Sequence, residues 1–218
     1  MSTVILLGFS TTGKSSIIKE IKDRNIDKNF VTIDTDKLVS KDYDNHIYNI
    51  YLNLVIGQDR VEAIKYIEKQ EDEILDSIYY SSKPRIIAAG PMLPFRKAWR
   101  DFVERIGPIC IYLEKSPRCI YDGLIERRER HIANDLINKH PAFGSWDQDI
   151  TTKFENGKWI LLPKRISISN IEKHLNQRVG IYNKYSNGRI YNSVKIKNNL
   201  RYKKKFYSDI ELAMGLTE

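Results

Sequence analysis

The chain has 218 residues, of which 41% are hydrophobic and 29% charged, and a net charge of +8. This length suits one α/β domain with an insertion, and a core of that size needs no disulfides or structural metal. Two cysteines cannot form a disulfide framework. The sequence contains no run of 18 apolar residues and no basic and then apolar segment at its start, so we expect a cytoplasmic protein without a membrane span. We also expect a monomer.

The positive charge gathers in the last quarter of the chain. Residues 158–205 contain thirteen Lys and Arg but one acid, Glu172, which gives a local balance of +12 and leaves −4 for the remainder. A block of this kind binds an anionic substrate or nucleic acid, or forms a solvated basic face. We therefore keep a nucleic-acid partner open as a hypothesis.

The first predicted element is an apolar strand over 3–7, which runs directly into the sequence Gly-Phe-Ser-Thr-Thr-Gly-Lys-Ser at 8–15. A helical pattern follows to about Arg24, so the run has the strand, turn and helix setting of a P-loop. Such glycines let backbone N–H groups surround a phosphate, while the lysine reaches the β- and γ-phosphates and the serine is a Mg²⁺ ligand. We expect an ATP site formed by Gly8, Ser10, Thr11, Thr12, Gly13, Lys14, Ser15 and Ser16.

A second strand is predicted over 29–33, and helical spacing of apolar residues predicts helices over 47–55 and 61–78. The third strand, 85–89, ends without an acid, although many P-loop proteins carry a magnesium-associated acid there. Asp34 and Asp36 follow the second strand two residues apart, and in extended backbone they would point the same way. We expect Asp34 to join the metal shell and Asp36 to face a phosphoryl acceptor. The alternative is that both aspartates only cap the next helix.

Further elements are predicted in the second half of the chain. They are a helix over 94–106, a strand over 109–113, a helix that begins at Ser116-Pro117, a hairpin about Asn156-Gly157, a helix over 167–187, a strand over 190–196 and a short helix from Ser208.

The order of strands and helices predicts a three-layer α/β/α P-loop kinase fold with a five-stranded parallel sheet. We expect a single domain with its core in 1–135 and 167–196, a lid over 136–166 and a basic extension over 197–218.

These features together resemble the shikimate kinase family of small P-loop kinases. The resemblance rests on the P-loop with Phe9, the Asp34-Thr35-Asp36 triplet, the strand end Ala88-Ala89-Gly90, the strand over 107–113, and Arg178 four residues before Tyr182. It implies that Lys14 and Ser15 hold phosphate and magnesium, that Asp34 lies in the magnesium shell, and that Asp36 binds the acceptor hydroxyl. It further implies roles for Arg178 on the substrate carboxylate, Arg60 and Gly90 in the acceptor pocket, and Arg127 and Arg130 at the nucleotide, with Arg130 closing from the lid. A solvated face of a charged helix is the alternative for Arg130.

The acceptor pocket departs from the family pattern. Two alanines replace strand-end glycines, Asp59-Arg60-Val61-Glu62 is an incomplete counterpart of Phe-Arg-x-x-Glu, and His131-Ile132-Ala133 replaces Pro-Leu-Leu. We therefore expect a kinase that uses ATP and Mg²⁺ to phosphorylate a hydroxyl of a small anionic acceptor, with shikimate as one candidate. The alternatives are a larger acceptor, such as a nucleic-acid end or a protein side chain, and a nucleotide-binding regulatory protein that has lost catalysis.

Overall fold

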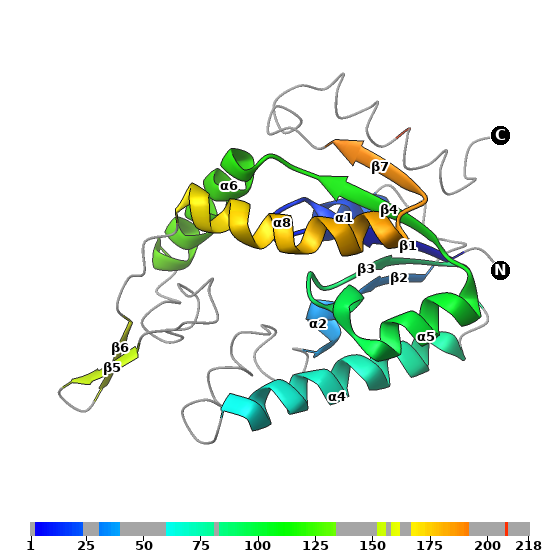
Figure 1. Cartoon of the computed structure of the whole chain (residues 1–218), viewed down its shortest axis with the longest axis horizontal. Coiled ribbons are helices and arrows are strands. Elements are labelled where there is room, and N and C mark those ends of the chain that lie inside the picture. The colour runs from blue at the N-terminus through cyan, green and yellow to red at the C-terminus, as the bar shows by residue number, and fades with distance from the viewer. Residues whose placement is uncertain are drawn as a thin grey trace.

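The computed structural model describes residues 3–23, 31–39, 60–80, 83–133, 152–155, 158–161, 167–191 and 208. A parallel sheet of five strands runs through these residues in the order β2-β3-β1-β4-β7 (Figure 1). The strands are β1 (Thr3–Leu7), β2 (Val31–Asp34), β3 (Arg85–Ala88), β4 (Ile109–Glu114) and β7 (Gly188–Tyr191). The predicted α/β class and five-stranded parallel sheet are confirmed.

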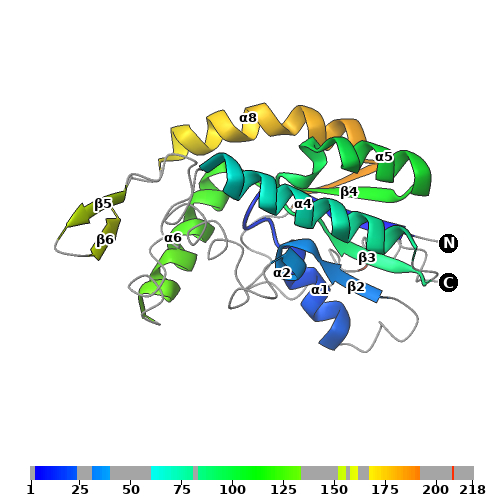
Figure 2. The ribbon, with the colours of Figure 1, turned by 90° about the horizontal axis from the view of Figure 1, so that it is seen from below.

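Successive side chains of β1 point to opposite faces of the sheet, and each face carries a hydrophobic core. Val4 and Leu6 join one cluster with residues of α1 (Lys14–Asp23), whereas Ile5 and Leu7 join a second cluster on the opposite face. That second cluster contains residues of α4 (Arg60–Tyr79), α5 (Lys97–Ile106) and α8 (Ile168–Tyr185). Figure 2 shows α1 on one side of the sheet and α5 and α8 on the other. Burial of both faces explains why the strands read as continuous apolar runs.

The structure corrects one predicted helix. The segment 94–106 is not continuous, because a 3-10 turn, η2 (Leu93–Phe95), is separated from α5 by Arg96. Arg96 has extended backbone, with φ −77° and ψ 150°. Its side chain forms ion pairs with acids of α4, and this tertiary contact favours a break that local helical spacing does not reveal.

The elements after β4 mostly follow the sequence. Helix α6 (Pro117–Ala133) begins as predicted, since the Cys119 N–H donates to Ser116 Oγ at 3.2 Å. The hairpin of β5 (Thr152–Glu155) and β6 (Lys158–Leu161) is antiparallel and lies away from the five-stranded sheet (Figures 1 and 2). The predicted helix over 47–55, and the terminal helix apart from Ser208, lie outside the described residues. Within the described ranges, no helix has the length and apolar character needed to cross a membrane.

Candidate active site

The P-loop has a strained and closely packed backbone. Gly8, Thr11 and Gly13 have positive φ values of 143°, 64° and 101°. A Cβ on Gly8 would lie 2.7 Å from the Leu113 carbonyl oxygen, so a larger residue would force the loop away from β4. Thr12, between the two glycines, donates from Oγ1 to the Phe9 carbonyl at 2.8 Å, so the loop is held in a tight turn.

Lysine side chains lie on both sides of this loop. Lys14, the first residue of α1, is 8% exposed and donates from Nζ to the Gly8 and Phe9 carbonyls at 2.7 and 3.0 Å. Lys115, which follows β4, donates from Nζ to the Thr11 carbonyl at 2.9 Å. Two ammonium groups therefore lie at the loop. Sequence analysis missed Lys115, because a single lysine after a strand carries no spacing signal.

The two aspartates after the second strand lie on different elements. Strand β2 ends at Asp34 and the short helix α2 (Thr35–Val39) begins at the next residue, so the expectation that both point the same way from extended backbone is wrong. Thr35 Oγ1 accepts a hydrogen bond from the Gly90 N–H at 2.8 Å, which joins the start of α2 to the end of β3. Asp34 is half-buried and pairs in register with Ala88 of β3.

Asp36 lies directly against Gly90. A Cβ built on Gly90 would be 2.5 Å from Asp36 Oδ1, a distance that a real side chain does not tolerate. Because glycine has no Cβ, the Asp36 carboxylate can occupy the space next to residue 90. The two predicted site residues are brought together, although 54 positions separate them in the sequence.

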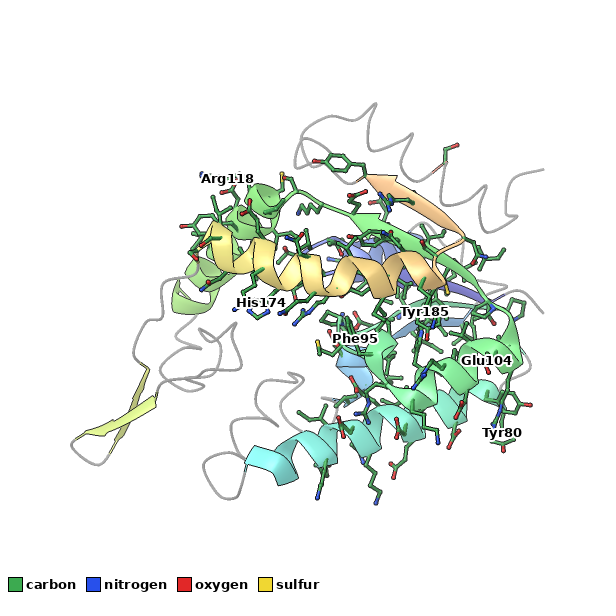
Figure 3. The ribbon with its side chains drawn as sticks, viewed as in Figure 1. Tyr80, Phe95, Glu104, Arg118, His174 and Tyr185 are labelled. Carbon is green, nitrogen blue, oxygen red and sulfur yellow. The ribbon has the colours of Figure 1, made fainter. Side chains whose placement is uncertain are left out.

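Helix α8 places Arg178 against the P-loop. Its guanidinium carbon lies 4.8 Å from the centre of the Phe9 ring, a cation–π contact with a residue of the loop itself. One turn later, the Tyr182 hydroxyl donates to the Pro91 carbonyl at 2.8 Å, next to Gly90. Burial raises the pKa of Tyr182, Arg178 opposes the rise and Asp36 adds to it. The ring of Phe95, which is labelled in Figure 3, meets the Tyr182 ring edge-on, with 6.2 Å between the ring centres, so η2 packs against α8 here.

A buried carboxyl group on α4 adjoins the same region. Glu71 is 6% exposed, and burial followed by the charge of Asp36 raises its pKa to about 8, with smaller increases from Asp72 and Glu68. The positive charge of Arg96 opposes these effects, and its Nε lies 3.7 Å from Glu71 Oε2. Sequence analysis missed this residue, although an acid on the apolar face that continues through Leu75 and Ile78 is a visible signal.

The other predicted site residues lie in the P-loop, in α1, at the start of α4 and in α6. Ser10 is partly exposed in the P-loop, and Ser15 and Ser16 are exposed in the first turn of α1. Arg60 begins α4 and Arg127 and Arg130 belong to α6, but the positions of these three side chains lie outside what the structure describes. The described part of the chain contains no cluster of three His, Cys, Asp or Glu side chains that could hold a metal. Mg²⁺ needs no such cluster, since it takes one or two protein ligands together with phosphate oxygens and water.

A parallel sheet with a P-loop after its first strand, and with acids after its second, defines the fold of a P-loop kinase. The chain is similar to solved shikimate kinase structures. That of Bacteroides thetaiotaomicron has a TM-score of 0.64 and 12% identity, with 98% of each chain covered. That of Aquifex aeolicus has a TM-score of 0.55 and 15% identity, with 98% of this chain and 96% of that one covered.

A third shikimate kinase, from Acinetobacter baumannii and solved in complex with shikimate, has a TM-score of 0.53 and 15% identity over 87% of this chain and 83% of its own. No protein-family model and no curated protein sequence matches the chain. At these identities the structures define the fold, which is that of the shikimate kinases.

Proposed function

We propose that the protein is a kinase that transfers the γ-phosphoryl group of ATP, with Mg²⁺, to a hydroxyl group of a small acceptor that carries a carboxylate. The observation that carries this proposal is the contact between Arg178 and Phe9. It joins a phosphate-binding loop to a region that contains Asp36, so that donor and acceptor groups would meet at one edge of the sheet. Ligands of open α/β sheets bind at this carboxyl edge.

The donor half is formed by the P-loop. Ser15 and Asp34 would hold Mg²⁺, which would neutralise charge on the β- and γ-phosphates. Lys14 and the N–H groups at the start of α1 would bind phosphate oxygens, and Arg130, near the end of α6, would close over them. Lys115 supports the loop from the β4 side through the Thr11 carbonyl. These groups act by positioning and by charge stabilisation, which are the main contributions to phosphoryl transfer.

The acceptor half is formed by Asp36 and Arg178. Asp36 orients the acceptor hydroxyl and receives its proton as the oxygen forms a bond to the γ-phosphorus and the bond to the ADP oxygen breaks. Arg178 binds the carboxylate in a planar bidentate pair. Arg60 and Gly90 complete the pocket, and shikimate is the first acceptor to test, since a protein of the same fold binds it.

The basic segment that suggested a nucleic-acid partner contains Arg178. The Arg178 guanidinium contacts Phe9, which is completely buried. At least one positive charge of the basic segment therefore points into the protein. A small acceptor therefore remains the preferred proposal, with a nucleic-acid end as an outcome of the test.

The test is an ADP-release screen with polyol acids, sugars, nucleosides and nucleic-acid ends as acceptors. We expect a hydroxy acid to raise ADP release above the rate with water, and Lys14→Ala to abolish that rise. A rise with nucleic-acid ends alone would exclude the small-acceptor proposal, and ADP release that no acceptor raises would favour a regulatory protein.

A further inference from the structure

The acceptor half of the proposed site comes from two helices that are far apart in the sequence. Asp36 belongs to α2, whereas Arg178 belongs to α8. A hydroxy acid bound by both residues places its hydroxyl group at Asp36 and its carboxylate at Arg178. The distance between these two side chains then decides which hydroxy acids fit, so the contacts that connect α2 with α8 bear on specificity.

The first connection runs from α2 to the end of β3. Thr35, the neighbour of Asp36 at the start of α2, is 1% exposed. Its Oγ1 accepts a hydrogen bond from the Gly90 N–H at 2.8 Å and donates to the Ala88 carbonyl at 3.4 Å. A Cβ on Gly90 would lie 2.5 Å from Asp36 Oδ1, so the carboxylate also lies next to Gly90. The start of α2 is thus fixed to this strand end by hydrogen bonds and by close packing.

The second connection begins one residue later and runs to α8. The Pro91 carbonyl accepts a hydrogen bond of 2.8 Å from the Tyr182 hydroxyl. Tyr182 is completely buried, and the centre of its ring lies 5.3 Å from that of Tyr112 and 6.2 Å from that of Phe95. These neighbours hold the hydroxyl in place. Arg178 precedes Tyr182 by one turn of α8, so the same bond positions Arg178.

The two adjacent residues that join these connections, Gly90 and Pro91, form a stiff link. The ring of Pro91 fixes its own φ angle. The Leu93 N–H donates back to the Gly90 carbonyl at 3.2 Å, which closes the chain into a turn at this point. A shift of α2 relative to α8 would therefore have to break or lengthen one of the two hydrogen bonds of 2.8 Å.

We propose that Tyr182 is a positioning residue, which fixes the separation of Arg178 from Asp36. Through this separation the protein selects hydroxy acids by the distance between their carboxylate and hydroxyl groups. Thr35 has the same role at the other end of the link, and both residues act through the groups that bind the acceptor. This inference rests on the proposed kinase function and adds the property by which that kinase distinguishes acceptors.

The test compares two acceptors that differ in this distance. They are the hydroxy acid with the highest turnover in the screen and its isomer with the hydroxyl group moved by one carbon. The native ratio of their kcat/KM values should be about 10 or more. Tyr182→Phe keeps the ring and removes the hydroxyl, so the ratio should fall about 5- to 10-fold, since one hydrogen bond has a free energy of this order. The KM for ATP should stay unchanged.

Tyr185→Phe is the matched control. It removes the same kind of hydroxyl three residues later on α8, where the ring meets Trp99 of α5, and should keep the native ratio. At the other end of the link, Thr35→Val removes the oxygen that binds the Gly90 N–H and should lower the ratio. Thr35→Ser keeps this oxygen and should retain the native ratio.

The ratio separates positioning from a purely structural role, which would lower kcat/KM for both acceptors alike. The inference is overturned by a native ratio in folded Tyr182→Phe, or by an equal fall in Tyr185→Phe. Should Tyr182→Phe fail to fold in a thermal melt, the two Thr35 variants decide in its place, and equal ratios in them overturn the inference.

The native protein separates this inference from the proposed function. If no hydroxy acid raises ADP release, the proposed function fails and the inference fails with it. If the native protein phosphorylates a hydroxy acid and its isomer equally well, the inference fails alone.

Discussion

The guanidinium of Arg178 lies over the ring of Phe9 at 4.8 Å, so a residue near the end of the chain contacts the P-loop near its start. Phe9 is completely buried and packs with residues of α6 and α8. The P-loop and α8 are therefore in direct contact. In the proposed site, this contact would join the donor half to the acceptor half.

Arg178→Lys tests the carboxylate contact. Lysine keeps the charge but not the planar pair of donors, so the acceptor KM should rise about 10-fold or more while the KM for ATP stays unchanged. Steady-state kinetics with varied acceptor give this value. Arg189→Lys is the control, because Arg189 pairs with Glu114 and is half-exposed. Equal KM values in the two variants would show that Arg178 does not bind the acceptor.

Gly90→Ala tests the space beside Asp36. The new Cβ would meet Asp36 Oδ1 at 2.5 Å and displace the carboxylate, so kcat should fall about 10- to 100-fold in a folded protein. Gly180→Ala is the matched control, since a Cβ there has no neighbour within 4 Å. It should retain activity and raise the free energy of unfolding by about 0.5–1 kcal/mol, because alanine favours a helix. Full activity in Gly90→Ala would contradict the placement of Asp36.

Lys115→Met tests the support of the P-loop. It removes the ammonium that binds the Thr11 carbonyl and a positive charge near the expected phosphates, so the Kd for ATP should rise about 10-fold. Calorimetric titration measures this change. Lys69→Met removes a lysine that is 74% exposed on α4 and should leave the Kd unchanged. Similar Kd values for the two variants would exclude the proposed support.

The pH dependence of stability tests the buried state of Glu71. Its pKa is about 8 in the folded protein and near 4.5 in the unfolded chain, so between these values the folded state binds a proton that the unfolded state lacks. The free energy of unfolding should therefore fall as pH rises through this window, by at most about 1.4 kcal/mol per pH unit from this group. Urea denaturation at three pH values should show a smaller fall in Glu71→Gln. Equal slopes would mean that Glu71 ionises normally.

Local sequence signals predicted the sheet and the P-loop, because a strand, a glycine-rich turn and a helix lie within about twenty adjacent residues. The prediction for Asp34 and Asp36 was correct about the end of β2, but the expected extended backbone through Asp36 was wrong, since that residue lies in α2. That outcome depends on where α2 begins, and Thr35 sets this through its contact with Gly90, which follows a different strand.

The group around Glu71 could not be predicted from spacing. Its members come from α2, α4 and the start of α5, and its key residue Arg96 belonged to a segment predicted as continuous helix. The break at Arg96 and the ion pairs with α4 form together in the folded chain. Sequence analysis lacked this tertiary contact, although the acid on the apolar face of α4 indicated where to look.

The central claim is that Asp36 serves the acceptor while the P-loop serves the donor. The most direct measurement is the rate at which the γ-phosphoryl group of labelled ATP reaches the acceptor in the native protein and in Asp36→Asn, with ATP binding measured in parallel. We expect the variant to bind ATP normally and to transfer the label about 10²- to 10⁴-fold more slowly. Transfer at the native rate by Asp36→Asn would contradict the account.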